Sequence, residues 1–124
     1  MVGPHIAILM CTLDGERFLA AQLASIMAQT HQNWTLWVSD DGSTDQTLEI
    51  LRATQVLWGK DRLKIISGPC EGFARNFLSL ACRSEIEADY YAFSDQDDIW
   101  LPSKLTRAHE QLTEQPKNTA LLYG

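Results

Sequence analysis

An acidic segment that follows an apolar run is the part of this chain best suited to chemistry. The segment Asp95-Gln96-Asp97-Asp98 places three carboxylates within four residues, directly after the apolar run Tyr90-Tyr91-Ala92-Phe93. That run is typical of a buried strand, and open α/β sheets bind their ligands at the carboxyl ends of strands. Carboxylates this close repel one another, and a divalent cation relieves the repulsion. Oxygen ligands suit Mg²⁺ or Mn²⁺, so the segment predicts a metal site that can also hold a phosphate.

Two other interpretations apply to acidic residues in such a chain. An acidic loop followed by a helix N-cap also fits the segment, because carboxylates favour the positive end of a helix. A calcium-binding EF-hand loop does not fit. Counted from Asp41, the sixth residue is Gln46 instead of Gly and the twelfth is Arg52 instead of Glu. Counted from Asp95, the fifth residue is Ile99, whose side chain has no oxygen.

The elements that position this segment follow from the spacing of apolar residues. Apolar runs predict strands at residues 6–11, 35–39, 63–67 and 90–94, and the start of a fifth at 120–123. Helical periodicity predicts helices at 17–29, 44–54 and 73–81, and a fourth that begins near Pro102. Ser43 and Gln46 form a candidate capping box for the second helix. Strand and helix alternation is typical of an α/β fold, Rossmann-like, with a mostly parallel sheet flanked by helices.

The buried face of each predicted helix is an apolar stripe. The first helix carries its stripe at Leu19, Leu23, Ile26 and Met27, the third at Phe73, Phe77, Leu80 and Ala81, and the fourth at Leu105, Ala108 and Leu112. The composition does not shift anywhere along the chain, so we expect residues 1–124 to form one domain. The Rossmann fingerprint G-x-G-x-x-G and the Walker phosphate loop are both absent from the sequence.

Polar clusters follow three of the four complete predicted strands. They are Thr12-Leu13-Asp14-Gly15, Asp40 to Asp45, and the acidic segment. In a parallel sheet these ends lie on one edge, so we expect the clusters to converge on one crevice. Asp14 and Asp41 can accept hydrogen bonds from a base or a ribose, and Arg75 can reach a phosphate or a base. A turn with a helix cap is the alternative for residues 40–45, and a surface salt bridge is the alternative for Arg75.

Composition and charge restrict the class of partner. The chain has ten basic and sixteen acidic residues, a net charge of −6, which disfavours nucleic acid as a partner. Three cysteines with no C-x-x-C pair indicate neither a zinc site nor a disulfide framework. No apolar stretch reaches the roughly 20 residues that a membrane-spanning helix needs, and the N-terminus lacks the features of a signal peptide. These features predict a cytoplasmic protein without a transmembrane segment.

Taken in order, these motifs resemble the nucleotide-sugar-binding half of a family-2 glycosyltransferase with the GT-A fold. The resemblance covers nearly the whole chain and consists of Ile8–Leu19, Gln22-Leu23, Ser25-Ile26, Gln29-Thr30, Val38–Asp45, Gly72–Phe77, Phe93–Trp100 and Lys104-Leu105. The last acidic block is similar to bacterial rhamnosyltransferase-like members that act on cell-surface polysaccharide.

The resemblance implies an inverting enzyme that moves a sugar from a nucleotide-diphosphate donor to a polysaccharide or glycolipid acceptor. It implies a donor site lined by Thr12, Leu13, Asp14, Asp41, Arg75, Asp95 and Gln96. The triplet Asp95-Gln96-Asp97 matches the family's D-x-D motif, in which Asp97 contacts Mn²⁺ or Mg²⁺. In the same motif Asp95 acts near the ribose or through a water on the metal. Asp41 matches the acid that binds the base.

The chain departs from the family pattern at two positions. The family usually has an aromatic residue and Asn where this chain has Leu13 and Asp14. Leu13 cannot stack on a base with an aromatic face, so the base contact is expected to be weaker or differently shaped. Asp14 adds a negative charge near the nucleotide, which is expected to raise the dependence on the metal.

The resemblance also implies that the catalytic base lies outside this chain. In the family, the acid that deprotonates the acceptor hydroxyl comes well after the D-x-D motif, so we expect it beyond Gly124 and name no catalytic residue here. Inverting transfer needs that base opposite the leaving nucleoside diphosphate. We therefore expect residues 1–124 to bind the donor and activate the leaving group, with little or no transferase activity alone.

Two alternative functions stay open from the sequence. One is a non-catalytic nucleotide-binding module that kept the fold. The other is an unrelated α/β nucleotidyl- or phosphoryl-transfer enzyme, which needs either a Gly/Lys loop that grips phosphate or a nucleophilic Asp after the first strand, where Asp14 is the sole candidate. An unpaired edge near Leu121–Tyr123 predicts a homodimer. The family adds a location at the inner face of the membrane.

Overall fold

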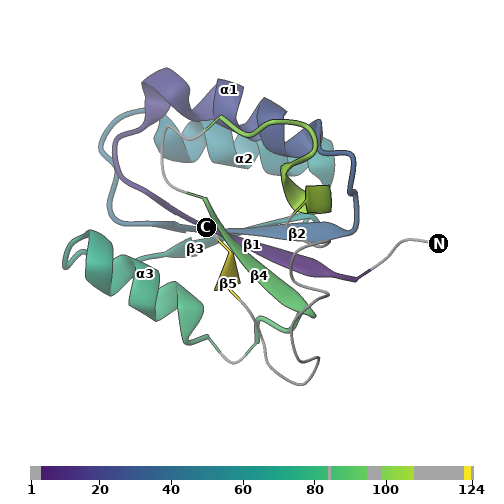
Figure 1. Cartoon of the computed structure of the whole chain (residues 1–124). Coiled ribbons are helices and arrows are strands. Elements are labelled where there is room, and N and C mark those ends of the chain that lie inside the picture. Colours follow the sequence, from purple (N-terminus) through teal and green to yellow (C-terminus); the bar gives the residue numbers. More distant parts are fainter. Residues whose placement is uncertain (1–3, 84, 95–98, 108–121, 124) are drawn as a thin grey trace.

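Five parallel strands form one sheet with helices on both faces (Figure 1). The computed structural model describes residues 4–83, 85–94, 99–107 and 122–123. The strands are β1 (Ile6–Thr12), β2 (Trp34–Asp40), β3 (Leu63–Ser67), β4 (Tyr90–Ser94) and β5 (Leu122–Tyr123), and the helices are α1 (Glu16–Met27), α2 (Thr47–Trp58) and α3 (Phe73–Ala81). The predicted α/β class with a parallel sheet is confirmed.

Strand β1 lies in the middle of the sheet. It pairs in parallel with β2 on one side and with β4 on the other, so that Ile8 lies opposite both Leu36 and Ala92. Every residue of β1 is buried. A parallel strand covered on both faces needs a continuous apolar sequence, which is why this run could be recognised without alternation.

The strand order β3-β2-β1-β4-β5 creates a switch point between β1 and β4. The chain moves outward from β1 to β2 and β3, and then returns to the other side of β1 to form β4. The strand order thus reverses between β1 and β4, and at such a switch point open α/β sheets form a crevice at the carboxyl ends of the strands. The acidic segment at 95–98 follows β4 directly in the sequence.

The helices divide the core into two layers. Helices α1 and α2 cover one face of the sheet and α3 covers the other (Figure 1). Leu19, Leu23 and Ile26 pack into the first layer as predicted, and Met27 packs against it partly buried. On the second face, Leu80 is buried and Phe77 is partly buried. Ala81 is exposed, contrary to prediction, because α3 ends at that residue and Leu80 fills the inward position.

The predicted capping box at the start of α2 is wrong. The helix begins at Thr47, its N-cap is Gln46, and the N-cap side chain makes no capping hydrogen bond. Ser43 is unavailable for capping because its Oγ donates to Asp40 Oδ1 at 2.6 Å and accepts the N–H of Asp14 at 2.9 Å. The helix also runs past the predicted end to Trp58, whose ring packs edge-on against Trp34 with a centroid separation of 5.5 Å.

The other bounds match the predictions or differ by one or two residues: α3 has the predicted bounds, α1 ends two residues earlier than predicted, and β1 and β2 extend by one residue at their ends. Strands β3 and β4 have the predicted bounds, and β5 pairs in parallel with β4. Residues 104–107 are helical and follow Pro102, while Ala108 and Leu112 lie outside the described residues. None of the helices in the described ranges is long and apolar enough to cross a membrane.

Candidate functional site at the carboxyl edge of the sheet

Asp14 ties the loop after β1 to the loop after β2. Its N–H donates to Ser43 Oγ at 2.9 Å, and its Oδ1 accepts the N–H of Thr44 at 2.8 Å and of Asp45 at 3.4 Å. Asp14 has a φ of 49°, in the left-handed region that Asp and Asn tolerate better than most residues. The two loops therefore form one continuous rim at the carboxyl edge.

A second reciprocal contact joins the first turns of α1 and α2. Asp45 Oδ2 accepts the N–H of Glu16 at 3.2 Å, and Glu16 Oε2 accepts the N–H of Gln46 at 3.2 Å. Each carboxylate thus satisfies an N–H at the start of the other helix. Desolvation acts to raise the pKa of Asp45, but hydrogen bonds from the Thr47 side chain and from backbone N–H groups outweigh it and lower that pKa.

The Asp40 carboxylate joins the end of β1 to the loop after β2. This buried group accepts the hydroxyls of Thr12 at 2.7 Å and Ser43 at 2.6 Å, and the N–H groups of Ser43 at 2.9 Å and Gly42 at 3.3 Å. The predicted site residue Thr12 is therefore buried, with its hydroxyl directed to Asp40. Leu13, the next residue, is 48% exposed at the rim.

Asp41 is the next residue after Asp40, and the protein holds one of its two carboxylate oxygens. Its side chain is 8% exposed, and Oδ1 accepts the N–H of Cys70 at 2.7 Å. Its backbone N–H donates to the carbonyl of Thr12 at 2.9 Å. Among the described residues we find no hydrogen bond to Oδ2. Asp41 thus combines a fixed position with an acceptor that a ligand can use.

Helix α3 approaches the same edge from the other face of the sheet. The Asn76 side chain is buried and joined to Ser39 of β2, donating from Nδ2 to the carbonyl at 3.0 Å and accepting the Ser39 hydroxyl at 2.5 Å. Arg75, the preceding residue, is exposed and makes no ion pair within the described part of the chain. The alternative of a surface salt bridge for Arg75 therefore has no support there.

Helix α1 holds the described residues on both sides of the acidic segment. Gln22 is buried and its Nε2 donates to Ser94 Oγ at 3.0 Å, at the end of β4. Ser25 lies one turn later on the same face, and its Oγ accepts the N–H of Trp100 at 3.0 Å. Asp95, Gln96 and Asp97, the residues predicted to bind the metal and nucleotide, lie between these anchors in sequence but outside the described residues.

Gln29, two residues beyond the end of α1, makes further contacts to the segment after the acidic residues. Its Nε2 donates to the carbonyl of Leu101 at 2.7 Å, and its Oε1 accepts the N–H of Leu105 at 3.0 Å. Because the amide nitrogen and the amide oxygen of Gln29 are both hydrogen-bonded to this segment, residues 101–105 are held against the C-terminal end of α1. The buried glutamines were part of the motifs noted in the sequence, but their partners could not be found there because they are 72 and 76 residues distant.

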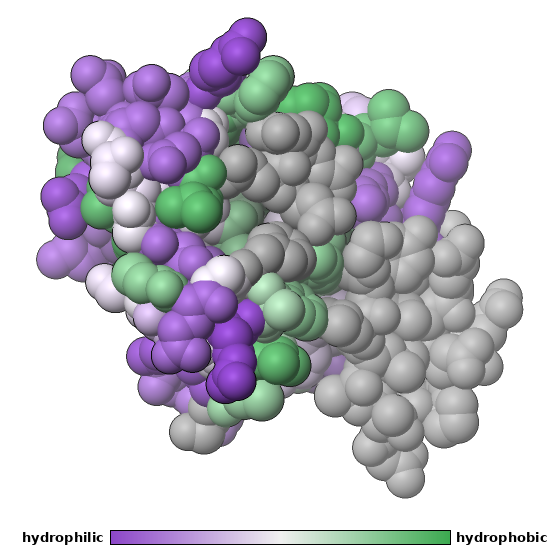
Figure 2. All heavy atoms as spheres, turned by 90° about the vertical axis from the view of Figure 1, so that its left-hand side faces the viewer, coloured by the Kyte–Doolittle hydropathy of each residue, from purple (hydrophilic) through white to green (hydrophobic). Residues whose placement is uncertain are grey.

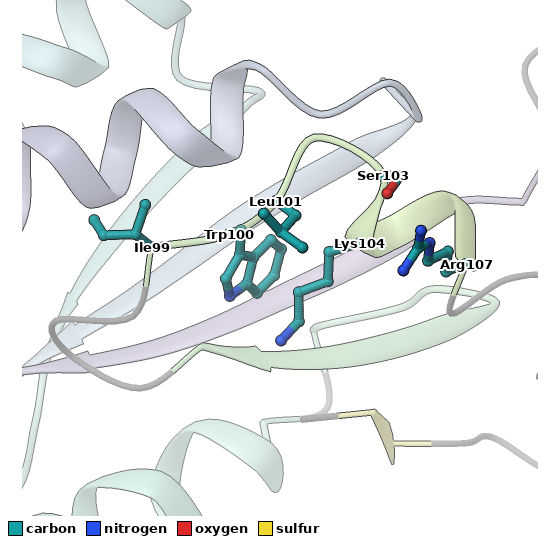
Figure 3. A pocket seen from close by; sticks show the side chains of 6 residues that line it. All are labelled: Ile99, Trp100, Leu101, Ser103, Lys104 and Arg107. Carbon is teal, nitrogen blue, oxygen red and sulfur yellow. The ribbon is translucent and has the colours of Figure 1, made fainter.

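A pocket of about 250 Å³ lies in the segment after the acidic residues (Figure 3). It is lined by Ile99, Trp100, Leu101, Ser103, Lys104 and Arg107. The Trp100 ring belongs to the core, and Lys104 Nζ lies 5.1 Å from its centroid. The lining of this pocket is therefore both apolar and cationic. Arg107 was not recognised in the sequence, because it belongs to no motif.

The structure brings together some of the predicted site residues and leaves others untested. Thr12, Leu13, Asp14 and Asp41 lie on two joined loops at one edge, the edge seen in Figure 2 with mostly hydrophilic residues beside scattered hydrophobic ones. No group of three or more His, Cys, Asp or Glu residues within the described ranges can hold a metal ion. The predicted metal ligands Asp95 and Asp97 lie outside those ranges.

Comparisons with known sequences identify the family of this chain. The model of Glycosyl transferase family 2 matches residues 7–122. The dTDP-rhamnosyl transferase RfbG of Shigella flexneri is 36% identical over 102 residues, which are 80% of this chain and 35% of that protein. The UDP-Glc:alpha-D-GlcNAc-diphosphoundecaprenol beta-1,3-glucosyltransferase WfgD of Escherichia coli is 28% identical over 119 residues, 96% of this chain and 44% of that protein. The chain thus spans less than half the length of either relative.

Solved structures give the same fold. TarS 1-349 of S. aureus in complex with UDP-GlcNAc is 27% identical with a TM-score of 0.69, covering 88% of this chain and 31% of that one. The mannosyltransferase PcManGT of Pyrobaculum calidifontis, solved with GDP-Man and Mn²⁺, is 18% identical with a TM-score of 0.79, covering 88% of this chain and 32% of that one. At that identity the second likeness concerns the fold alone.

Proposed function

This chain belongs to glycosyl transferase family 2, and we propose that it binds a nucleotide-diphosphate sugar, with a divalent metal, for transfer of the sugar to a polysaccharide or glycolipid acceptor. The observation that carries the proposal is the convergence of the loops after β1 and β2 at the switch point beside β4. A crevice of this kind is where open α/β sheets bind nucleotides. The complex of the related TarS with UDP-GlcNAc supports the class of donor.

Within the described residues, the proposed donor site has three parts. Asp41 accepts a hydrogen bond from the base through Oδ2, while Oδ1 stays with Cys70. Leu13 and Asp14 form the rim that borders the base and ribose, and the buried Thr12 supports that rim through its hydrogen bond to Asp40. Arg75 supplies a cation near the nucleotide, and its exposure without an ion pair in the described ranges leaves the guanidinium open to a ligand.

The metal belongs to the acidic segment in this proposal. Asp97 and Asp95 offer oxygen ligands of the kind that Mn²⁺ and Mg²⁺ prefer, and Gln96 lies between them near the donor. A bound metal neutralises charge on the leaving diphosphate. The chain's own contribution is to fix the ends of that segment, through the hydrogen bonds of Gln22 and Ser25 on α1.

We place the general base of transfer in a part of the enzyme beyond these residues. The chain corresponds to less than half of RfbG or WfgD. Residues 1–124 then act as a single donor-binding domain, without catalytic turnover of their own. Family membership favours this function over an unrelated phosphoryl-transfer enzyme. In addition, the hydrogen bonds to Asp14 Oδ1 give that carboxylate a structural role instead of a nucleophilic one.

The proposal extends to the cellular setting and the oligomeric state. We infer a cytoplasmic protein that works at the inner face of the membrane, because a lipid-linked acceptor would be found there. We also propose a homodimer through the edge strand β5, which pairs with β4 on one side. Size-exclusion chromatography with light scattering tests the dimer directly, and a monomer at all concentrations would contradict it.

The donor site is tested by calorimetric titration of the 124-residue chain with UDP, dTDP and GDP, each with and without Mn²⁺. We expect one of these nucleotides to bind only with the metal, and Asp97→Ala to abolish that binding. Asp61→Ala is the matched control, because Asp61 is an exposed carboxylate at the opposite edge of the sheet, just before β3. Binding that persists in Asp97→Ala would contradict the metal role, and the absence of binding for all three would contradict the proposed donor site.

A further inference from the structure

We propose that Gly68 and Asn76 are positioning residues that set the orientation of the Asp41 carboxylate. The inference rests on the proposed function, in which Asp41 binds the nucleotide base. Neither Gly68 nor Asn76 is expected to touch the nucleotide. They allow the end of β2, the loop after β3 and the start of α3 to meet closely. In this arrangement the protein holds one oxygen of the Asp41 carboxylate and leaves the other to the ligand.

Gly68 is required here for space. A Cβ added to Gly68 would lie 2.5 Å from Asn76 Oδ1 and 2.9 Å from Asp41 Oδ1, closer than real Cβ atoms approach other heavy atoms. The N–H of Gly68 donates to the carbonyl of Asp40 at 2.7 Å, so the backbone cannot easily withdraw. Any larger residue must therefore displace the Asp41 carboxylate, the Asn76 side chain or the loop itself.

Asn76 is the second residue that packs closely against Gly68. Its side chain is 1% exposed and satisfies both the hydroxyl and the carbonyl of Ser39, two residues before Asp41 on the same chain segment. A buried amide that satisfies both groups fixes the start of α3 against the end of β2, because each unmade bond would leave a buried polar group unpaired. Arg75, one residue earlier, is held relative to Asp41 by the same contact.

These contacts set the orientation of the Asp41 carboxylate. Beside Gly68, the loop turns so that the N–H of Cys70 reaches Asp41 Oδ1 at 2.7 Å. Cys70 has a φ of 59°, and a turn this tight keeps its N–H close to the carboxylate. With Oδ1 held, rotation of the Asp41 side chain is restricted, so Oδ2 does not need to be ordered when the ligand binds.

The first test needs no nucleotide. Exchange of the Cys70 amide hydrogen, followed by NMR on the 124-residue chain, reports whether the bond to Asp41 is intact. We expect Gly68→Ala to speed this exchange about tenfold or more, which corresponds to about 1.4 kcal/mol. Ser67→Ala is the control, because Ser67 is the exposed residue directly before Gly68. Unchanged exchange in Gly68→Ala would overturn the proposal.

The second test uses nucleotide affinity in a double-mutant cycle. Gly68→Ala is expected to weaken binding of the nucleotide preferred by the wild type about tenfold, and to cause no further loss in the Asp41→Ala background. Additive losses would mean that Gly68 acts elsewhere, and would contradict the positioning role. If the wild type binds no nucleotide, the proposed function fails for this chain, while the exchange experiment still decides whether Gly68 positions Asp41.

A third variant guards against misfolding of Gly68→Ala. Asn76→Ala removes the atom that lies nearest to the added Cβ, so the double variant Gly68→Ala/Asn76→Ala relieves the contact at 2.5 Å. We expect it to fold, as judged by a cooperative urea transition, and to keep the fast Cys70 exchange because Asp41 remains displaced. Wild-type exchange in this folded double variant would contradict the proposal.

Discussion

Gln22 on α1 donates a hydrogen bond of 3.0 Å to Ser94 at the end of β4, and both side chains are buried. The two residues are 72 positions apart in sequence. Ser94 directly precedes the acidic segment, so this single bond anchors the start of the proposed metal-binding residues to a helix on one face of the sheet.

Replacing Gln22 by Leu should destabilise the protein and weaken metal-dependent nucleotide binding. Leu fills a similar volume but leaves the Ser94 hydroxyl buried without this donor, at a cost of about 1–3 kcal/mol. Urea denaturation measures the loss of stability, and calorimetry with Mn²⁺ measures the binding. The double variant Gln22→Leu/Ser94→Ala removes both partners of this bond and should recover part of the lost stability, because the Ser94 hydroxyl is then no longer buried without its donor. A double variant less stable than the single one would contradict this explanation.

Replacing Asp14 should separate its structural role from its charge. Asp14→Asn keeps an oxygen that can accept the N–H of Thr44, and Asn tolerates the positive φ of this position. The sequence suggested that the Asp14 charge raises the dependence on the metal, but Oδ1 is engaged by the N–H groups of Thr44 and Asp45, so we expect the stability and nucleotide affinity of Asp14→Asn to match the wild type. Asp14→Ala loses the acceptor and should be less stable by about 1 kcal/mol in urea denaturation. A large change in Mn²⁺ dependence for Asp14→Asn would show instead that the negative charge acts on the ligand.

The contribution of Asp45 to stability should depend on pH. Its pKa is lowered in the folded protein from the ordinary value of 3.8, because hydrogen bonds from Thr47 and the backbone outweigh the effect of desolvation. A carboxyl with a depressed pKa stabilises the fold above its unfolded pKa and loses that contribution as the pH falls through the folded value. The wild type should therefore exceed Asp45→Asn in urea midpoint at pH 7. The difference should shrink below about pH 4, and an equal difference at pH 7 and pH 3 would contradict this assignment.

Leu13 offers a way to improve the base contact. It is 48% exposed at the rim, so a larger side chain there does not disturb the core. Leu13→Tyr provides an aromatic face for stacking, and a favourable aromatic contact of about 1 kcal/mol corresponds to roughly fivefold tighter binding in calorimetry. Leu57→Tyr is the control, because Leu57 is an exposed leucine on α2. Equal affinities for Leu13→Tyr and the wild type would place the base away from this residue.

The local sequence pattern was sufficient to predict the bounds of β3 and β4, but not the start of α2. The bounds of β3 and β4 could be predicted because a strand buried in a parallel sheet is marked by its own apolar residues. The start of α2 could not, because Ser43 has a second use: it bonds to Asp40 and Asp14, and only the fold brings Asp14 within reach.

The sequence alone determined the fold class, the family motifs and the set of polar residues at the carboxyl edge, because apolar periodicity and motif order are local properties of the chain. The tertiary structure decided which of those polar groups are engaged with the protein and which remain for a ligand. Thr12 and Asp40 bond to each other across 28 residues, while Arg75 has no ion pair in the described ranges and Asp41 has only one oxygen held. Hydrogen-bond partners so far apart in sequence meet only when the strands pair, so no local pattern can assign them.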